Sequence, residues 1–432
     1  MNIAILTNFS EFNPGYSLTG IVVDQAEMLA KYGHKVYVFV NENFNEKYND
    51  DIGLSQIINK YPDKIELVPK IVFLHLVDYQ TKNNISEEHI IGARKQAQFL
   101  EGFLIANRIT TVFTHDFIFT GWNLPYALAL MDTQKRFRGS NIKWLHWVHS
   151  IPSGNKDWWY LNEYPDHNYI VFPTRSEVNR VSESFQARQS QVLLIPHIKD
   201  IRNWYDFSEE TKDIIDMYPG LMQHEIVQVY PCSSDRLHAK QLHLLIQLFG
   251  FIKKAQSKVF LLAVNQWATG RQRKEDISKY IQLAEHCNLE YGKDFAFTSE
   301  IELLGEKPYE IGVSKRILRE LQLLQSLFIF PTVEESFGLV GPEAAYSGAL
   351  VIANKSLPLL TEVLGLHTPQ YNFGSFLENV DAIKDDNYLQ AVAYSILGRI
   401  ATSDSVKTKM FCRTRYNMDN IYHKYYLPYI LH

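Results

Sequence analysis

The stretch Glu335-Ser-Phe-Gly-Leu-Val-Gly-Pro-Glu343 decides the fold of this chain. Before it, residues 327–330 form a short apolar run closed by a proline, which is typical of a buried strand in a parallel sheet. After it, Pro342 is expected at the first position of a helix that Gly348 ends. The glycines between the two glutamates interrupt any continuous helix. The sequence therefore predicts a strand–turn–helix unit, with Glu335 in the loop and Glu343 in the first helical turn.

The turn inside this stretch has the chemistry of an anion site. The backbone N–H groups of Leu339 and Val340 are expected to have no helical partners, and such amides bind phosphate. Carboxylates on both sides can accept hydrogen bonds from hydroxyl groups. A sugar nucleotide carries both kinds of group. The residues expected to contact it are Ser336, Phe337, Gly338, Leu339, Val340 and the two glutamates.

The nine residues resemble the E-x7-E motif of the retaining glycosyltransferases of family 4, which have the GT-B fold. The resemblance implies an α/β protein with two Rossmann-like, doubly wound parallel-sheet domains facing a cleft, and a C-terminal helix that crosses back to the first domain. It also implies that Glu343 binds the ribose hydroxyls. Glu335 is implied to meet the donor sugar, or the charge that develops on it. The same spacing also fits an ordinary strand–loop–helix unit of any doubly wound sheet.

Short apolar runs alternate with helical patterns along the whole chain, which favours parallel α/β architecture. The polar stretch 199–212 lacks strong periodicity, so we place the domain boundary there. The expected domains are an acceptor-side domain at 1–200 and a donor domain at 213–410. Residues 411–432 are expected to form the helix that packs back on the first domain.

Composition excludes several classes of protein. The chain has 432 residues, a net charge of −5 and three widely spaced cysteines, so neither a disulfide framework nor a zinc pattern follows. The N-terminus lacks the pattern of a signal peptide, and no apolar run is long enough to span a bilayer. We therefore expect a cytoplasmic enzyme with at most peripheral membrane contact. Nucleic acid is a possible but disfavoured partner.

In the second half, Arg236 and Lys240 lie between an expected strand at 227–230 and an expected helix at 242–252. They resemble the paired basic residues with which the family binds the donor diphosphate. Gln241 stands where the family usually has glycine, and the gap between the two cations is shorter than in many members. A departing diphosphate needs cations, which favours this role over two solvated side chains.

The first half offers weaker candidates. The loop after the first strand contains Gly15 and Gly20, which compete for the role of the glycine that lets the backbone approach the donor phosphate. His149 follows a strand and matches a histidine that the family places near the transferred sugar. Candidates with less support are Ile301 near the nucleobase, and His115, Asp116 and Trp158 on the acceptor side.

The implied reaction moves a sugar from a UDP- or GDP-sugar to an acceptor hydroxyl. The chain has no Asp-x-Asp sequence, which disfavours the metal-dependent GT-A class. We expect no metal and no cofactor beyond the nucleotide sugar. Three alternatives stay open, namely a sugar-nucleotide 2-epimerase of the same fold, a catalytically silent glycan- or nucleotide-binding protein, and a glycosyltransferase acting on hydroxymethylated DNA bases. The sequence identifies neither donor nor acceptor.

Overall fold

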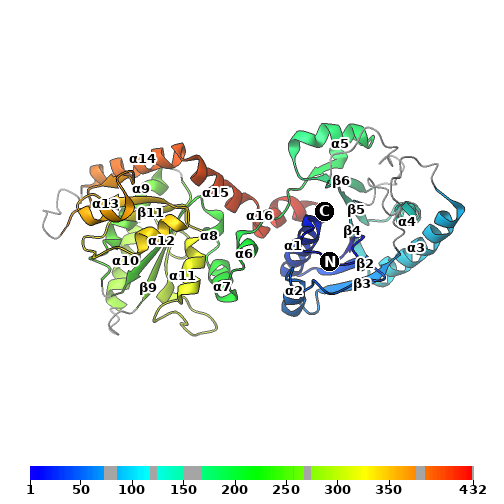
Figure 1. The fold of residues 1–432 in the computed structure, drawn as a ribbon, viewed down its shortest axis with the longest axis horizontal. Helices are drawn as coiled ribbons and strands as arrows, with labels where there is room; N and C mark the ends of the chain where they lie inside the picture. Colours follow the sequence, from blue (N-terminus) through cyan, green and yellow to red (C-terminus); the bar gives the residue numbers. More distant parts are fainter. Residues whose placement is uncertain are drawn as a thin grey trace. The chain divides into compact units, whose positions relative to one another are not determined.

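The structure is a computed structural model, and it describes residues 1–72, 85–116, 124–149, 167–234, 236–255, 257–266, 274–375 and 385–430. The chain forms two compact units (Figure 1). Unit 1 comprises residues 1–198 and 418–432, and unit 2 comprises residues 199–417. The chain therefore enters unit 2 at the start of the predicted boundary segment and returns to unit 1 seven residues later than the predicted 411.

Unit 1 contains a parallel sheet with the strand order β3-β2-β1-β4-β5-β6-β7. Its strands are β1 (Asn2–Leu6), β2 (Lys35–Asn41), β3 (Ile65–Ile71), β4 (Ile109–His115), β5 (Lys143–Trp147), β6 (Asn168–Phe172) and β7 (Val192–Leu194). Its helices are α1 (Ser17–Lys31), α2 (Leu54–Lys60), α3 (Glu87–Ala106), α4 (Leu124–Arg136) and α5 (Val178–Ser184). The order reverses between β1 and β4, so ligands are expected at the carboxyl ends of these strands.

Alternate residues of these strands enter two different cores, which gives unit 1 three layers. Ile3 and Ile5 of β1 pack with α1, α2 and the C-terminal segment. Ala4 and Leu6 pack with α3 and α4. Strands covered on both faces are apolar nearly throughout, which is why the sequence pattern located them.

The C-terminal segment belongs to unit 1. It consists of α16 (Met418–Ile421), a π-helical turn (Tyr422–Tyr426) and α17 (Leu427–Ile430). Tyr422 stacks on Tyr32 with ring centroids 3.6 Å apart, and its hydroxyl lies 2.8 Å from His34 Nε2. Asp419 accepts a hydrogen bond from the Tyr32 hydroxyl at 2.7 Å. The predicted return of the chain end to the first domain is confirmed.

Unit 2 has the same plan, with strand orders β10-β9-β8 and β11-β12-β13. Its strands are β8 (Ile226–Ser233), β9 (Val259–Gln266), β10 (Phe295–Phe297), β11 (Leu327–Phe330), β12 (Leu350–Asn354) and β13 (Gln370–Tyr371). Its helices are α6 (Ile201–Trp204), α7 (Glu209–Met217), α8 (Gly220–Gln223), α9 (Leu242–Lys254), α10 (Lys274–His286), α11 (Lys315–Gln322), α12 (Val340–Tyr346), α13 (Pro358–Leu364), α14 (Asp386–Thr402) and α15 (Asp404–Arg415).

A buried glutamine joins the two halves of the unit 2 sheet. Gln228 of β8 is fully buried, and its side-chain amide accepts from Ile329 N at 2.9 Å and donates to Ile329 O at 2.8 Å. Nearby, Ser326 N donates to Val227 O at 2.9 Å. β8 and β11 therefore lie side by side, and the order through both halves is β10-β9-β8-β11-β12-β13. The predicted pair of Rossmann-like parallel sheets is confirmed.

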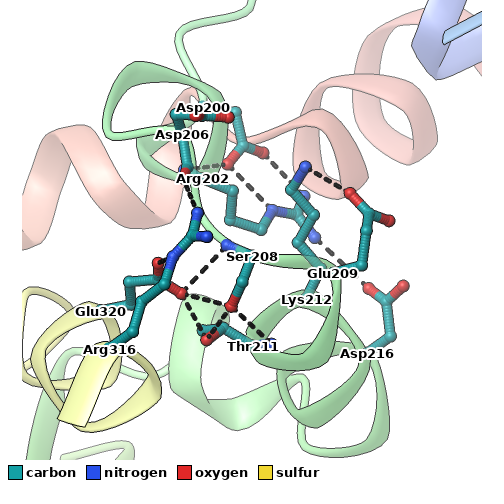
Figure 2. Close-up of polar contacts among 10 residues, drawn as sticks. All are labelled: Asp200, Arg202, Asp206, Ser208, Glu209, Thr211, Lys212, Asp216, Arg316 and Glu320. Carbon is teal, nitrogen blue, oxygen red and sulfur yellow. Dashed lines mark hydrogen bonds and ion pairs between the residues drawn. The ribbon is translucent and has the colours of Figure 1, made fainter. Parts of the chain in front are cut away.

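The polar segment after residue 198 is bound tightly to unit 2 (Figure 2). Glu320 of α11 is 7% exposed and accepts from Ser208 N at 3.0 Å, Ser208 Oγ at 2.7 Å and Thr211 Oγ1 at 2.5 Å. Arg316 donates to the same carboxylate at 2.8 Å. Burial opposes ionisation, but the hydrogen bonds from Thr211, Ser208 and Arg316 together lower the pKa of Glu320. The segment predicted as an aperiodic boundary is therefore part of a folded unit.

Candidate active site

Two loops meet at the carboxyl edge of the unit 2 sheet, one after β8 and one after β11. Lys240 from the first loop donates a hydrogen bond to the carboxylate of Glu335 from the second. Their side chains are only 15% and 14% exposed. The carboxyl ends of neighbouring parallel strands share one edge of the sheet, which is why residues 95 positions apart come together. The structure thus joins the predicted cation to the first glutamate of the nine-residue stretch.

Arg236 lies nearer to solvent. Its guanidinium donates to Glu334 at 2.7 Å, with side chains 44% and 57% exposed. The backbone N–H of Lys240 donates to Arg236 O at 2.9 Å, so the two cations lie four residues apart, at the two ends of one helical turn. The structure therefore places the exposed ion pair Arg236–Glu334 beside the largely shielded pair Lys240–Glu335. Glu334 is a site neighbour that the motif did not indicate.

Gln241 explains how the chain does without the glycine expected after the lysine. Its backbone is left-handed, with φ +50° and ψ +41°, a conformation that favours glycine. The side chain is 2% exposed and donates to Pro331 O at 2.7 Å and to Phe373 O at 2.6 Å. Next to it, the hydroxyl of buried Tyr230 donates to Lys240 O at 2.7 Å. These bonds fix the backbone that carries Lys240.

The turn of the nine-residue stretch is tightly packed at Gly338. This residue has φ +79°, and a Cβ there would lie 3.1 Å from side-chain atoms of both Leu360 and Phe330. The helix then begins at Val340, so the expectation of Pro342 at its first position is wrong by two residues. The cause is that the chain enters the helix directly from Leu339, which already has helical angles.

The backbone amides of Leu339 and Val340 meet the requirement for an anion site. Within the part of the chain that the structure describes, neither N–H group donates to an acceptor. Leu339 is 68% exposed and Phe337 is 52% exposed, and Ser336 and Glu343 are also exposed. The turn therefore presents donors and a carboxylate to solvent beside the Lys240–Glu335 pair.

Buried asparagines hold the remaining loops of this edge. The Asn354 amide, at the end of β12, donates to Thr332 O at 2.9 Å and Gly374 O at 2.8 Å. Asn265 in β9 donates to Ser234 Oγ at 3.0 Å and Ser299 Oγ at 2.8 Å. The sequence argument did not single out these residues, although a polar residue at the end of an apolar strand was a usable signal. Ile301, predicted near the nucleobase, is a core residue that is only 1% exposed.

The carboxyl edge of the unit 1 sheet carries a cluster of histidines. His115 ends β4, and its Nδ1 lies 2.8 Å from Nε2 of His149. Asp116 accepts from His149 N at 3.1 Å. Burial raises the pKa of Asp116 to about 6, and burial together with His197 lowers the pKa of His149 to about 3. The structure brings three of the predicted residues into one contact group and adds His197, which the sequence argument missed.

The other residues predicted for the site in unit 1 lie in different parts of the structure. Gly15 lies in the exposed loop before α1, where its N–H donates to Asn13 Oδ1 at 2.8 Å. Gly20 lies inside α1, because the helix begins at Ser17 rather than after the glycine. Burial and then the charge of Asp116 raise the pKa of Tyr16, so this loop lies near the histidine cluster. Trp158 falls outside the described residues.

The described ranges contain neither a cluster of potential metal ligands nor a membrane-spanning helix. No group of three or more His, Cys, Asp or Glu side chains there is arranged to hold a metal ion. No described helix has both the length and the apolar character needed to cross a membrane.

Comparisons with known proteins gave matches among solved structures alone. No family model matches the sequence, and no curated protein matches it. A glycosyltransferase from Rickettsia africae is 14% identical over 100% of this chain and 95% of that chain, with a TM-score of 0.32. Anabaena Alr3699/HepE in complex with UDP is 11% identical over 98% of both chains, with a TM-score of 0.33.

A third similar structure is the UDP-GlcNAc 2-epimerase from Neisseria meningitidis bound to UDP-GlcNAc. It is 11% identical over the full length of both chains, with a TM-score of 0.31. With similarity at this level, assignment of a function depends on the residues of this chain itself.

Proposed function

We propose that this chain is a retaining glycosyltransferase of the family 4 type. It moves a sugar from a nucleotide-diphosphate sugar to an acceptor hydroxyl. The observation that carries the proposal is the meeting of Lys240 and Glu335 beside the unpartnered amides of Leu339 and Val340. A cation, a carboxylate and free amides on one sheet edge suit a diphosphate joined to a sugar.

The proposed chemistry follows the charges that develop in the reaction. When the bond from the sugar ring carbon to the diphosphate oxygen breaks, positive charge grows on the carbon and negative charge on the diphosphate. Lys240, Arg236 and the two amides stabilise the diphosphate. Glu335 faces the positive ring carbon, and Glu343 accepts from the ribose hydroxyls. A diphosphate oxygen takes the proton of the acceptor hydroxyl as that hydroxyl attacks from the same face.

The hydrogen-bonded ion pair between Lys240 and Glu335 supports this chemistry. Each side chain offsets the charge of the other, which stabilises both charges at a largely shielded position. Binding of a diphosphate gives Lys240 a second anion and leaves Glu335 available for the sugar. The pair therefore holds both groups in position before the donor arrives, which lowers the cost of arranging them in the transition state.

The test begins with binding of the full-length protein to UDP-, GDP- and ADP-sugars, measured by thermal shift. Donors that raise the melting temperature are then mixed with sugar, lipid-linked and hydroxymethylated DNA acceptors, and products are identified by mass spectrometry. NMR of protein plus donor alone detects a 2-epimerase, because epimerisation needs no acceptor. Donor binding that is unchanged in both Lys240→Met and Glu343→Gln would contradict the proposed site.

A further inference from the structure

A cavity of about 550 Å³ lies at the amino edge of the unit 1 sheet. The neighbouring strands β1, β4, β5 and β6 begin at this cavity, and α17 of the C-terminal segment forms another part of its wall. Its volume lies in the range of sites that bind small molecules. Ligands of α/β sheets ordinarily bind at the opposite edge, where the strands end. The cavity shares no residue with the candidate active site or with the histidine cluster.

The described residues that line the cavity supply hydrogen-bonding groups and no carboxylate. The polar residues of this lining are Thr110, Asn141, Lys143, His167, Tyr169 and Tyr429. The side chains of Asn141, His167 and Tyr169 have no hydrogen-bond partner among the described residues. An amide, an imidazole and a phenol are therefore available to a ligand at one place, beside a lysine.

Lys143, the first residue of β5, gives the cavity its positive charge. Its Nζ donates to Tyr429 O at 2.8 Å, which uses one of its three N–H donors. Partial burial lowers the pKa of Lys143, and no carboxylate in the described ranges pairs with it. Lys35, the first residue of β2 at the same edge, does have such a partner, because Glu66 lies 3.6 Å away. Lys143 is therefore a partly shielded ammonium group with two remaining donors and no counter-charge among the described residues.

The surface beside Lys143 is apolar on one side and fixed in position on the other. Lys143 and Leu145 lie on one face of β5, and Tyr169 pairs with Leu145 in the neighbouring strand. His167 precedes β6 with φ +63°, and its carbonyl accepts from Trp144 N at 2.9 Å. The left-handed conformation has a cost that glycine would avoid, but glycine would not supply an imidazole to the lining.

We propose that this cavity binds a sugar phosphate, with the phosphate group bonded to Lys143 and the sugar hydroxyls bonded to the unpartnered side chains beside it. The phosphate brings the negative charge that the described lining lacks, and its oxygens accept from the two remaining N–H donors of Lys143. A cavity of about 550 Å³ also takes the body of a sugar, which a bare phosphate ion would leave unfilled. The proposal does not depend on the glycosyltransferase activity proposed above.

Hydrogen exchange of the wild-type full chain with ribose 5-phosphate locates the ligand directly. We expect slower exchange at residues 141–145, 167–169 and 428–430, which meet at the cavity. Ribose is expected to cause no change, and inorganic phosphate a smaller one. Slower exchange confined to the loops after β8 and β11, or no change anywhere, overturns the proposal even if no variant folds. An equal effect of ribose would exclude an anion site, and an equal effect of inorganic phosphate would exclude the contacts to the sugar.

Calorimetric titration with ribose 5-phosphate tests the role of Lys143. Lys143→Met removes the charge and is expected to raise the Kd about ten- to a hundredfold, the scale of a charge-assisted hydrogen bond. Lys35→Met is the matched control and should leave the Kd unchanged, because Lys35 begins a strand at the same edge but does not line the cavity. An unchanged Kd in Lys143→Met, or an equal rise in Lys35→Met, overturns the proposal.

The same titration separates this cavity from the candidate active site. Lys240→Met disables the proposed donor site in unit 2 and is expected to leave the Kd for ribose 5-phosphate unchanged. A loss of binding in Lys240→Met that Lys143→Met does not share would place the phosphate in unit 2 and overturn the proposal. If the protein transfers no sugar but binds ribose 5-phosphate through Lys143, the proposed function fails while the cavity keeps its ligand.

Discussion

Gln241 combines a backbone conformation that disfavours it with a side chain that the site needs. The left-handed position costs a non-glycine residue about 1–2 kcal/mol. The two hydrogen bonds from its amide to Pro331 O and Phe373 O return about 1 kcal/mol each and satisfy buried carbonyl groups. The glycine of the family motif and the glutamine of this chain are therefore two solutions for one turn. Glycine avoids the backbone strain. Glutamine offsets the strain, because its amide hydrogen-bonds the loops that follow two different strands.

This balance predicts an unusual order of stability among variants. Gln241→Ala keeps the strain and loses both hydrogen bonds, so we expect it to lose about 2 kcal/mol of unfolding free energy. Gln241→Gly loses the same bonds but relieves the strain, and should be about 1 kcal/mol more stable than the alanine variant. Urea denaturation measures both. Arg108 is the control, because it has φ +49° and an exposed side chain. At the control position, the alanine variant should have nearly the wild-type unfolding free energy, and the glycine variant should be more stable than the wild type. Equal losses of unfolding free energy at the two positions would contradict this account.

Lys240 and Glu335 should behave as one functional unit. We expect Lys240→Met and Glu335→Gln each to lower kcat by about 10²–10³, because each removes a preorganised charge. In stability, the double variant should lose less than the sum of the single variants, with a coupling of about 0.5–3 kcal/mol. Lys293→Met is a matched control, since Lys293 pairs with Glu290 at 2.9 Å on the surface of the same unit. Additive losses in the cycle, or a control variant as inactive as Lys240→Met, would show that the pair has no special role.

At the scale of the element, the turn into α12 depends on one glycine. Gly338→Ala adds a Cβ that meets Leu360 and Phe330 at 3.1 Å and also places alanine at φ +79°. Gly348, at the other end of α12, has φ +77° but its nearest neighbour is Lys409 Nζ at 3.9 Å. The two alanine variants share a backbone cost of about 1–2 kcal/mol, and Gly338→Ala carries the contact cost as well.

We therefore expect Gly338→Ala to be the less stable variant by thermal denaturation. It should also weaken donor binding, because the alanine displaces the amides of Leu339 and Val340. Gly348→Ala should leave donor binding near the wild-type value. Equal donor affinity in the two variants would mean that the turn does not contact the donor.

Strands and helix starts differed in how well the sequence located them. β11 agrees at both ends with the predicted strand 327–330, because a fully buried strand is an apolar run, here closed by a proline. The starts of α1 and α12 were each misplaced, since Gly20 and Pro342 are local signals that the surrounding packing overrides. β13 was missed, because two residues carry no periodicity.

In the candidate site, as in the fold, the sequence located some features and not others. Lys240 and Glu335 could be placed on one edge from the order of strand and helix, because topology alone brings strand ends together. The contacts of Gln241, Asn354 and His197 could not be predicted, since they join loops far apart in the sequence, although a polar residue at the end of an apolar run marks Asn354 as a candidate. The segment 199–212 was read as a boundary because its apolar residues are few. This segment is bound to the rest of unit 2 by hydrogen bonds to the buried carboxylate of Glu320. A periodic pattern of apolar residues does not reveal such bonds.

The two units should differ in their response to acid. Among its described residues, unit 1 contains four histidines whose pKa values burial lowers strongly. The pKa of His34 and of His146 falls to about 4, that of His149 to about 3, and that of His115 well below its ordinary value. Each stays neutral in the folded state at a pH where the unfolded chain takes up a proton near its ordinary value of 6.5. The unfolded state then binds more protons, so the unfolding free energy is highest above pH 6.5 and falls as the pH drops from 6.5 toward 4. For fully buried His146 alone this loss amounts to about 3 kcal/mol.

We therefore expect unit 1 to unfold before unit 2 when the pH is lowered from 7 to 4. Hydrogen exchange read out by mass spectrometry assigns the opening to each unit. His146→Gln should flatten the pH dependence of unit 1, although it costs stability at pH 7 because His146 bonds Thr114 at 2.8 Å and Asn168 at 2.9 Å. His286→Gln, at an exposed site on α10, should leave the profile unchanged. If unit 2 opens first, or if the His146 variant keeps the full slope, buried neutral histidines do not govern the acid stability of this protein.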